Sequence, residues 1–164
     1  MIGDCEIGVA SQVDVDGILR LQESNLPYNG GTLSVRFARG WFEATIQAMP
    51  IIVARRAGLI GYLVSSSIEA HAEVPIVRAM LEAHPGGAGA YVYGPICVAA
   101  SARRQGIAGL MFKALREQLP GQEGILFIRR DNEPSLRAHK RMGINEVAEF
   151  EFNGTTYAVL SYVG

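Results

Sequence analysis

The strongest constraint on the fold is one segment in which an apolar, strand-like run passes through a glycine-bearing turn into a helix-like run. The turn has the sequence VAASARRQGIA and covers residues 98–108. Before it, YVYGPICV is rich in the β-branched and aromatic residues that favour strands. After it, GIAGLMFKAL repeats apolar residues at the spacing of one helical face. The pattern predicts a strand over 91–98 and a helix over 106–119.

The start of the predicted helix has the properties of an anion-binding site. The N–H groups of a first helical turn have no partner within the helix and lie at the positive end of its dipole. Gly106 has no Cβ, and Ala108 and Gly109 are also small, so an anion can approach the backbone closely. Arg103 and Arg104 add two positive charges beside this helix end. The turn is therefore predicted to hold a phosphate group.

The composition is that of an ordinary globular protein. Hydrophobic residues make up 49% of the 164 residues and charged residues 19%, a balance that argues against disorder. The length predicts a single domain over residues 1–164. The net charge of −1 gives no general attraction to nucleic acid or to an acidic membrane surface, so neither is expected as a partner.

Cysteine usage and hydropathy restrict the compartment. Cys5 and Cys97 are too few for a disulfide framework or a four-ligand zinc site, so we expect a reducing compartment and no metal. No N-terminal segment has the form of a secretion signal, and no apolar run approaches the ~20 residues that span a bilayer. These features predict a cytoplasmic protein.

The N-terminal half is predicted to alternate helices and strands. Ser11 and Asp14 have the spacing of a helix start, and Val15, Ile18 and Leu19 then share one helical face. The predicted elements are a strand over 4–10, a helix that ends at 25–27, a loop over 26–32, a helix over 34–48, and strands over 51–55 and 59–68.

The C-terminal half contains an irregular stretch and then a second α/β pattern. Residues 69–90 exceed the usual length of a connection, include a helix-like run over 74–83, and are predicted to line or cover a site. Asn153-Gly154 is a preferred pair for a two-residue hairpin turn, which places Phe150 opposite Tyr157. The other predicted elements are a strand over 125–130 and a short helix over 134–142.

The residues of the turn also have the spacing of a known sequence motif. Arg103, Gly106 and Ala108 fill the three defining positions of the pattern (Q/R)-x-x-G-x-(G/A). In this place, between the fourth strand and the third helix, the pattern resembles the acetyl-CoA signature of the GNAT superfamily of N-acetyltransferases. The resemblance implies that the turn holds the pyrophosphate of acetyl-CoA through backbone N–H groups.

A second motif supports the same resemblance. A strand at 125–128, Asn132, a short helix and then Gly143-Ile144 follow the order of another GNAT motif. The order of elements is similar over nearly all 164 residues. The resemblance implies a mixed α/β fold with a mostly antiparallel central sheet of about six to seven strands. This sheet is expected to splay between its fourth and fifth strands and to be flanked by about four helices.

The resemblance also implies which residues bind acetyl-CoA. In the splayed region the fourth strand has backbone groups free for the pantetheine and supplies the donor that stabilises the thioester oxygen. Asn132 is a further contact, with capping of the following helix as its alternative role. The predicted cofactor-binding residues are Ile96, Cys97, Val98, Arg103, Arg104, Gln105, Gly106, Ile107, Ala108, Gly109, Asn132 and Ser135.

Proton transfer has one named candidate. His139 stands where many GNAT members carry a Tyr that is proposed to protonate the departing CoA thiolate. With an ordinary pKa of ~6.5 an imidazole can donate such a proton, so His139 is the predicted general acid. The alternative is a polar residue near the pantetheine that takes no part in proton transfer.

The sequence does not single out a general base. Cys97 lies in an apolar strand with no His or Asn spaced to activate it, and is interpreted as packing rather than as a nucleophile. The candidates for a base or a water-linked relay are Glu69, His71, Glu73, Tyr91 and Tyr93.

The implied reaction is transfer of acetyl from acetyl-CoA to a primary amine of a small molecule or peptide by direct attack. The amine is not specified, because its pocket would be formed by the loops at 26–32 and 69–90. Two alternatives stay open: a non-catalytic acyl-CoA-binding or regulatory module, and an unrelated nucleotide-binding protein. The second alternative has little support, because the sequence contains neither G-x-x-x-x-G-K-[ST] nor G-x-G-x-x-G, the motifs of common nucleotide-binding sites. Homodimers are common in the family, and the terminal hairpin is a candidate dimer interface.

Overall fold

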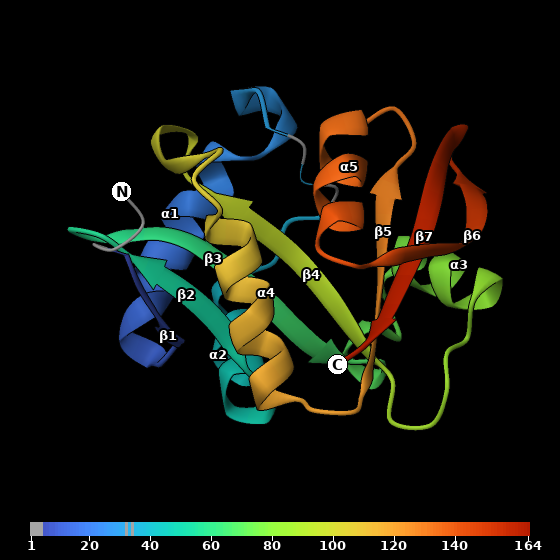
Figure 1. The fold of residues 1–164 in the computed structure, drawn as a ribbon, viewed down its shortest axis with the longest axis horizontal. Helices are drawn as coiled ribbons and strands as arrows, with labels where there is room; N and C mark the ends of the chain where they lie inside the picture. The colour runs from blue at the N-terminus through green and yellow to red at the C-terminus, as the bar shows by residue number, and fades with distance from the viewer. Residues whose placement is uncertain (1–4, 32, 34) are drawn as a thin grey trace. The chain divides into compact units, whose positions relative to one another are not determined.

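The computed structural model describes residues 5–31, 33 and 35–164, in which strands and α-helices are joined by short 3₁₀ turns (Figure 1). The strands are β1 (Glu6–Val9), β2 (Ile51–Arg55), β3 (Leu59–Ser67), β4 (Tyr91–Val98), β5 (Glu123–Arg129), β6 (Asn145–Phe152) and β7 (Thr155–Val163). The helices are α1 (Val15–Ser24), α2 (Arg39–Ala48), α3 (Pro75–Ala83), α4 (Ile107–Gln118) and α5 (Glu133–Arg141). None of these helices is long and apolar enough to cross a membrane, within the residues described.

The sheet has the strand order β1-β2-β3-β4-β5-β7-β6. β2 is antiparallel to β1 and β3, and β7 is antiparallel to β5 and β6. β4 and β5 pair in parallel over two residue pairs, Tyr91 with Gly124 and Val92 with Ile125. The predicted mixed α/β fold is thus confirmed, including the interruption of regular pairing between the fourth and fifth strands. α3 adds a fifth helix to the four predicted, counted over the described residues.

The residues group into two compact units, and the boundary falls within β4. The first unit is the described chain up to Ser65 together with Gly94–Gln118. The second unit is Ser66–Tyr93 together with Leu119–Gly164. The single domain expected over residues 1–164 therefore stays a prediction.

In the first unit, β2 lies at the centre of the apolar core. Ile51, Ile52, Val53 and Ala54 are completely buried. Both faces of the strand are therefore covered, which explains its continuous apolar sequence. α4 packs on β1 and β2, and α1 packs on α2. This core supports the beginning of α4, where the predicted phosphate site lies.

In the second unit, β7 has the corresponding central place. Ala158, Val159 and Leu160 are completely buried, and β7 pairs with a strand on each side. α3 packs on β6, and its bounds confirm the helix-like run predicted over 74–83.

The β6–β7 hairpin has the predicted turn and register. Asn153 and Gly154 have φ values of 50° and 76°, the left-handed values of a type I′ turn. Phe150 pairs with Tyr157 as expected, and their rings stack with centroids 5.2 Å apart.

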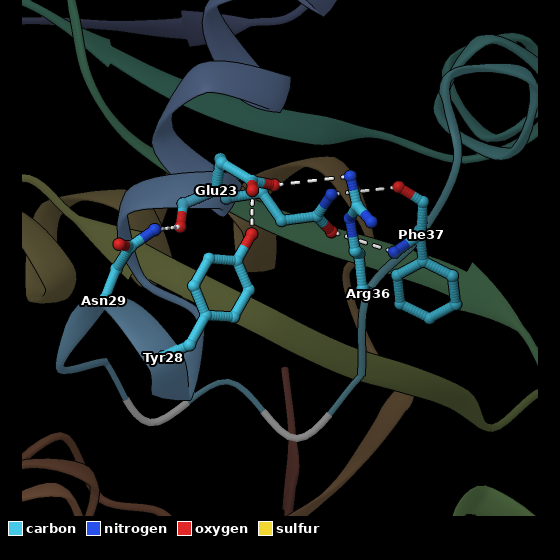
Figure 2. Close-up of polar contacts among 6 residues, drawn as sticks. Glu23, Tyr28, Asn29, Arg36 and Phe37 are labelled. Carbon is cyan, nitrogen blue, oxygen red and sulfur yellow. Dashed lines mark hydrogen bonds and ion pairs between the residues drawn. The ribbon is translucent and has the colours of Figure 1, made fainter.

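The second helix begins later than the sequence predicts. Ser34, its predicted first residue, lies outside the described residues, and α2 begins at Arg39. The reason lies in the backbone of Phe37. Its N–H donates to Gln22 Oε1 and its carbonyl accepts from Gln22 Nε2, both over 2.9 Å, as the dashed lines in Figure 2 show. With both groups bound to a side chain of α1, Phe37 stays out of the helix, and Ala38 forms an extended N-cap.

Other boundaries differ by one or two residues. β1 covers Glu6–Val9 rather than 4–10, of which Asp4 lies outside the described residues. β3 ends at Ser67 because Ile68 is the N-cap of a 3₁₀ turn. β5 begins at Glu123, two residues early, because Glu123 and Gly124 continue the ladder with β7.

Candidate functional site

The turn predicted to hold phosphate connects β4 to α4 in the first unit. After Val98 a 3₁₀ turn covers Ala100–Ala102, and α4 begins at Ile107. Between them the backbone is left-handed at Arg104, with φ 63°, and at Gly106, with φ 79°. Glycine adopts this conformation freely, whereas a residue with a side chain is strained by ~1 kcal/mol or more. Such turns direct successive N–H groups to one side, which is the geometry of an anion-binding nest.

The N–H groups at the start of α4 are the donors available to an anion. The first bond back along the chain joins Leu110 N to Gly106 O over 3.1 Å. Ile107, Ala108 and Gly109 precede it, so their N–H groups have no acceptor within the helix. A Cβ built on Gly109 would meet no atom within 4 Å, so the backbone is open on this side. Ile107 is buried, whereas Ala108 and Gly109 are half-buried. Donors without a helical acceptor at a helix start fit a pyrophosphate.

The two arginines of the turn differ in their contacts. The Arg103 guanidinium donates to Val98 O over 3.2 Å and to Asn25 Oδ1 over 2.7 Å, so it is fixed within the first unit. Arg104 is exposed, and its side chain makes no hydrogen bond or ion pair to the described residues. Both partners of Arg103 are neutral, so both arginines keep their charge, but Arg104 is the one whose side chain is not held by other described residues.

Gln105 fastens the turn to the β2–β3 hairpin. Its Oε1 accepts from Arg56 NH1 over 2.8 Å, and its Nε2 donates to Ser101 O over 3.3 Å. Gln105, which is predicted to contact the cofactor, thus also holds the turn in place through its own hydrogen bonds.

The predicted pantetheine contacts lie at the end of β4. Ile96 and Val98 are half-buried, and Cys97 is buried. Burial raises the pKa of the Cys97 thiol to about 11, so it stays protonated at neutral pH. A buried, neutral thiol agrees with the interpretation of Cys97 as a packing residue. Any polar contact of Cys97 with a ligand would therefore come from its backbone groups.

In the second unit, Asn132 is the N-cap of α5. Its Oδ1 accepts from Ser135 N over 3.4 Å, which is the capping role named as the alternative. Gly143 follows the helix with φ 89°, the left-handed conformation typical of a helix end. The role of Asn132 and Ser135 toward acetyl-CoA stays a prediction.

His139 is buried, with 5% of its surface exposed, and is bound through both ring nitrogens. Ser135 O can only accept, so Nδ1 carries the proton and donates to it over 2.7 Å. Burial lowers the pKa of His139, which favours the neutral ring. Nε2 then accepts, and the Tyr93 hydroxyl donates to it over 3.1 Å. A role of His139 as general acid, which needs a proton on Nε2, stays a prediction.

The five candidates for a base occupy different environments. Glu69 and Glu73 are exposed, whereas His71 is buried with Nε2 2.5 Å from Ser66 Oγ. Tyr91 is buried and its hydroxyl bonds that of Tyr162. Tyr93 is the one whose hydroxyl contacts His139, and burial raises the pKa of its phenol. No group of three or more His, Cys, Asp or Glu that could hold a metal occurs in the described part of the chain.

The sequence analysis missed the polar residues at the end of α1. Figure 2 shows Glu23 at the centre of this cluster: Tyr28 donates to its carboxylate, Asn29 donates to its carbonyl over 2.8 Å, and Arg36 lies 3.4 Å away. These contacts close the loop between α1 and α2 onto the helix. Neither periodicity nor a motif marks them, because they depend on how the loop folds back onto Glu23: two join side chains to its carboxylate and one joins a side chain to its carbonyl.

Comparison with known proteins places the chain in a family. Residues 18–144 match the acetyltransferase (GNAT) family, which is more than half of the chain. The chain therefore belongs to the GNAT family of acetyltransferases, and acyl transfer is its class of chemistry. No curated protein matches it in sequence.

Solved structures show the same fold at low sequence identity. yncA of Salmonella typhimurium, a putative acetyltransferase solved with acetyl-CoA, has a TM-score of 0.72 and 15% identity, with 97% of this chain and 93% of that chain covered. The ribosomal-protein-alanine N-acetyltransferase of Brucella melitensis has a TM-score of 0.71 and 17% identity, with coverage of 97% and 99%. NAA60 of Arabidopsis thaliana, solved in complex with acetyl-CoA, has a TM-score of 0.68 and 16% identity, with coverage of 97% and 98%.

Proposed function

We propose that the protein is an N-acetyltransferase that transfers acetyl from acetyl-CoA to a primary amine of a small molecule or peptide by direct attack. The observation that carries the proposal is the turn between β4 and α4. Its left-handed residues Arg104 and Gly106 lead into a helix whose first N–H groups, those of Ile107, Ala108 and Gly109, have no acceptor within the helix. Membership of the GNAT family and the two acetyl-CoA-bound neighbours support the same co-substrate.

Each group of residues has a task in binding acetyl-CoA, which supplies an activated acetyl thioester. The N–H groups at the start of α4 bind the pyrophosphate, and exposed Arg104 adds a positive charge. Backbone groups of Ile96, Cys97 and Val98 pair with the pantetheine and stabilise charge on the thioester oxygen. Asn132 and Ser135 are assigned further contacts.

The proton steps are assigned to Tyr93 and His139. The acceptor ammonium must lose a proton before attack, and the thiolate must gain one afterwards. In the neutral tautomer, the proton nearest to His139 Nε2 is that of the Tyr93 hydroxyl. Donation by His139 itself would require a proton on Nε2, and the Tyr93 hydroxyl would then accept from this nitrogen instead of donating to it. The contact between Tyr93 and His139 supports a proton path that includes both residues.

The proposal also includes a cytoplasmic location. Cys5 and Cys97 are both free thiols. Free cysteines are the usual state in the reducing cytoplasm, where acetyl-CoA is also used.

Two measurements test the proposal. Isothermal titration with acetyl-CoA, ATP and NAD is expected to show binding of acetyl-CoA alone. Thiol release from acetyl-CoA is then followed across a panel of amino acids, polyamines, aminoglycosides and N-terminal peptides, and one class is expected to accelerate it. Binding without acceleration by any amine would instead support the non-catalytic acyl-CoA-binding module, and binding of ATP or NAD instead of acetyl-CoA would contradict both.

A further inference from the structure

Asn25 connects the end of α1 to the turn that precedes α4. It is the C-cap of α1, and 7% of its surface is exposed. Its Nδ2 donates to Leu21 O over 2.8 Å, and its Oδ1 accepts from Arg103 NH2 over 2.7 Å. The amide orientation is fixed by this pairing, because the reverse would set a donor against a guanidinium and an acceptor against a carbonyl. The bond joins residues 78 positions apart in the sequence.

Arg103 extends the connection into the turn. Its Nε donates to Val98 O at the end of β4, while its other contact holds Asn25. The next residue, Arg104, has the strained left-handed conformation. A residue with a side chain keeps such a conformation only where its surroundings impose it. Arg103, fastened at both β4 and α1, is the neighbour that imposes it.

The backbone of Asn25 fastens the loop between α1 and α2. Its carbonyl accepts from Leu33 N over 3.2 Å. A Cβ built on Gly31 would lie 1.8 Å from the same oxygen, so the loop passes directly over Asn25. Figure 2 shows the neighbouring contacts of this loop, in which Tyr28 and Asn29 reach back to Glu23. The loop over 26–32, of which Thr32 lies outside the described residues, is one of the two loops expected to contact the acceptor; the other covers 69–90.

We propose that Asn25 is a positioning residue that couples the acceptor loop to the acetyl-CoA turn. Its side chain orients Arg103 and so stabilises the left-handed Arg104, while its carbonyl holds the loop at Leu33. The inference rests on the proposed function, because it assigns the turn to acetyl-CoA and the loop to the acceptor. An amide satisfies both partners here, with a donor for Leu21 O and an acceptor for the guanidinium, and the acceptor is the part that couples Asn25 to the turn.

A double-mutant cycle tests the coupling. Asn25→Ala, Arg103→Ala and the double variant are compared by titration with acetyl-CoA. Asn25→Ala is expected to weaken binding by about tenfold. The double variant is expected to bind no more weakly than Arg103→Ala, because either single change already removes the bond between Asn25 and Arg103. Asn25→Asp keeps an oxygen for Arg103 and is expected to restore affinity to within about threefold. Gln12→Ala is the matched control, since Gln12 is an exposed amide whose hydrogen bond goes to Glu43 O and not to a residue of the turn, and no change is expected.

Hydrogen exchange in the free protein gives a readout that does not depend on acetyl-CoA. Asn25→Ala and Arg103→Ala are both expected to accelerate exchange at residues 103–106 and at Leu33, whereas Gln12→Ala is not. Unchanged exchange at these positions, or additive losses of affinity in the cycle, would overturn the coupling. If the wild type did not bind acetyl-CoA, the proposed function would fail, while exchange would still decide whether Asn25 orders the turn. Asn25→Asp and Arg103→Ala decide the question if Asn25→Ala does not fold.

Discussion

Gly106 and Arg104 have the same left-handed backbone conformation, but its energetic cost differs between them. Both are left-handed, with φ values of 79° and 63°. At Gly106 the conformation is unstrained, whereas at Arg104 it costs ~1 kcal/mol or more. Strain retained at an exposed arginine beside the first N–H groups of α4 supports the proposed binding role of the turn.

Gly106 allows the charge of a substitution to be separated from its strain. Gly106→Ala and Gly106→Glu introduce the same left-handed strain, but only Glu places a negative charge beside the N–H groups of α4. We expect Gly106→Glu to abolish detectable binding of acetyl-CoA and Gly106→Ala to weaken it by about tenfold or less. Titration calorimetry measures both, and thermal unfolding checks that the two variants have similar stability. Equal affinities for the two variants would contradict a pyrophosphate site at this turn.

His139 is expected to be a neutral ring protonated on Nδ1. Ser135 O accepts from Nδ1, and Nε2 can accept from the Tyr93 hydroxyl, so the hydrogen bonds match a ring with one proton, on Nδ1. Burial lowers its pKa, so the ring is expected to stay neutral at neutral and mildly acidic pH. Two-bond nitrogen–proton NMR correlations of the ring distinguish the tautomers. A proton on Nε2 at neutral pH would contradict this assignment and favour His139 as the general acid.

At the scale of helices and strands, elements set by local chemistry are predictable from the sequence. The β6–β7 turn follows from Asn153-Gly154, and the start of α5 follows from Asn132 ahead of a proline. The start of α2 is not predictable, because it depends on Gln22 binding both backbone groups of a residue 15 positions away.

The candidate site divides in the same way. Residues 103–109 carry a motif, and the structure shows the open helix end that the motif predicts. The partner of Arg103 was not predictable, since Asn25 has no periodic or motif relation to the turn. Long-range side-chain contacts depend on packing, which a single sequence does not display.

Gly124 illustrates packing between elements. It pairs with Tyr162 in the β5–β7 ladder, and a Cβ built on it would lie 2.4 Å from the tyrosine ring. We expect Gly124→Ala to displace this ring and lower the free energy of unfolding by about 1–3 kcal/mol. Urea unfolding measures the change. Gly40→Ala in α2 is the control, since a Cβ there meets no atom within 4 Å, and stability is expected to be unchanged or slightly higher. Equal stability of the two variants would show that Tyr162 does not depend on a glycine at this position.

At the scale of the whole molecule, buried histidines connect stability to pH. His71 and His139 both belong to the second unit and are 2% and 5% exposed. Burial lowers the pKa of His71 to about 4, and it also lowers the pKa of His139. Neither ring is exposed enough to accept a proton from water without cost, so protonation and unfolding compete.

The lowered histidine pKa values predict that the free energy of unfolding already falls at a pH above the range in which carboxylates titrate. In the unfolded chain both histidines have a pKa of ~6.5, so below that pH the unfolded state binds more protons. Their contribution to stability is therefore fully present above pH ~6.5 and is lost as the pH falls toward the folded values. For His71 the loss between pH 7.5 and pH 5 is about 2 kcal/mol. Urea unfolding at these two pH values measures it. His71→Gln, which keeps an amide for Ser66 Oγ, is expected to lose correspondingly less on acidification, and an equal acid loss in the variant would contradict the assignment.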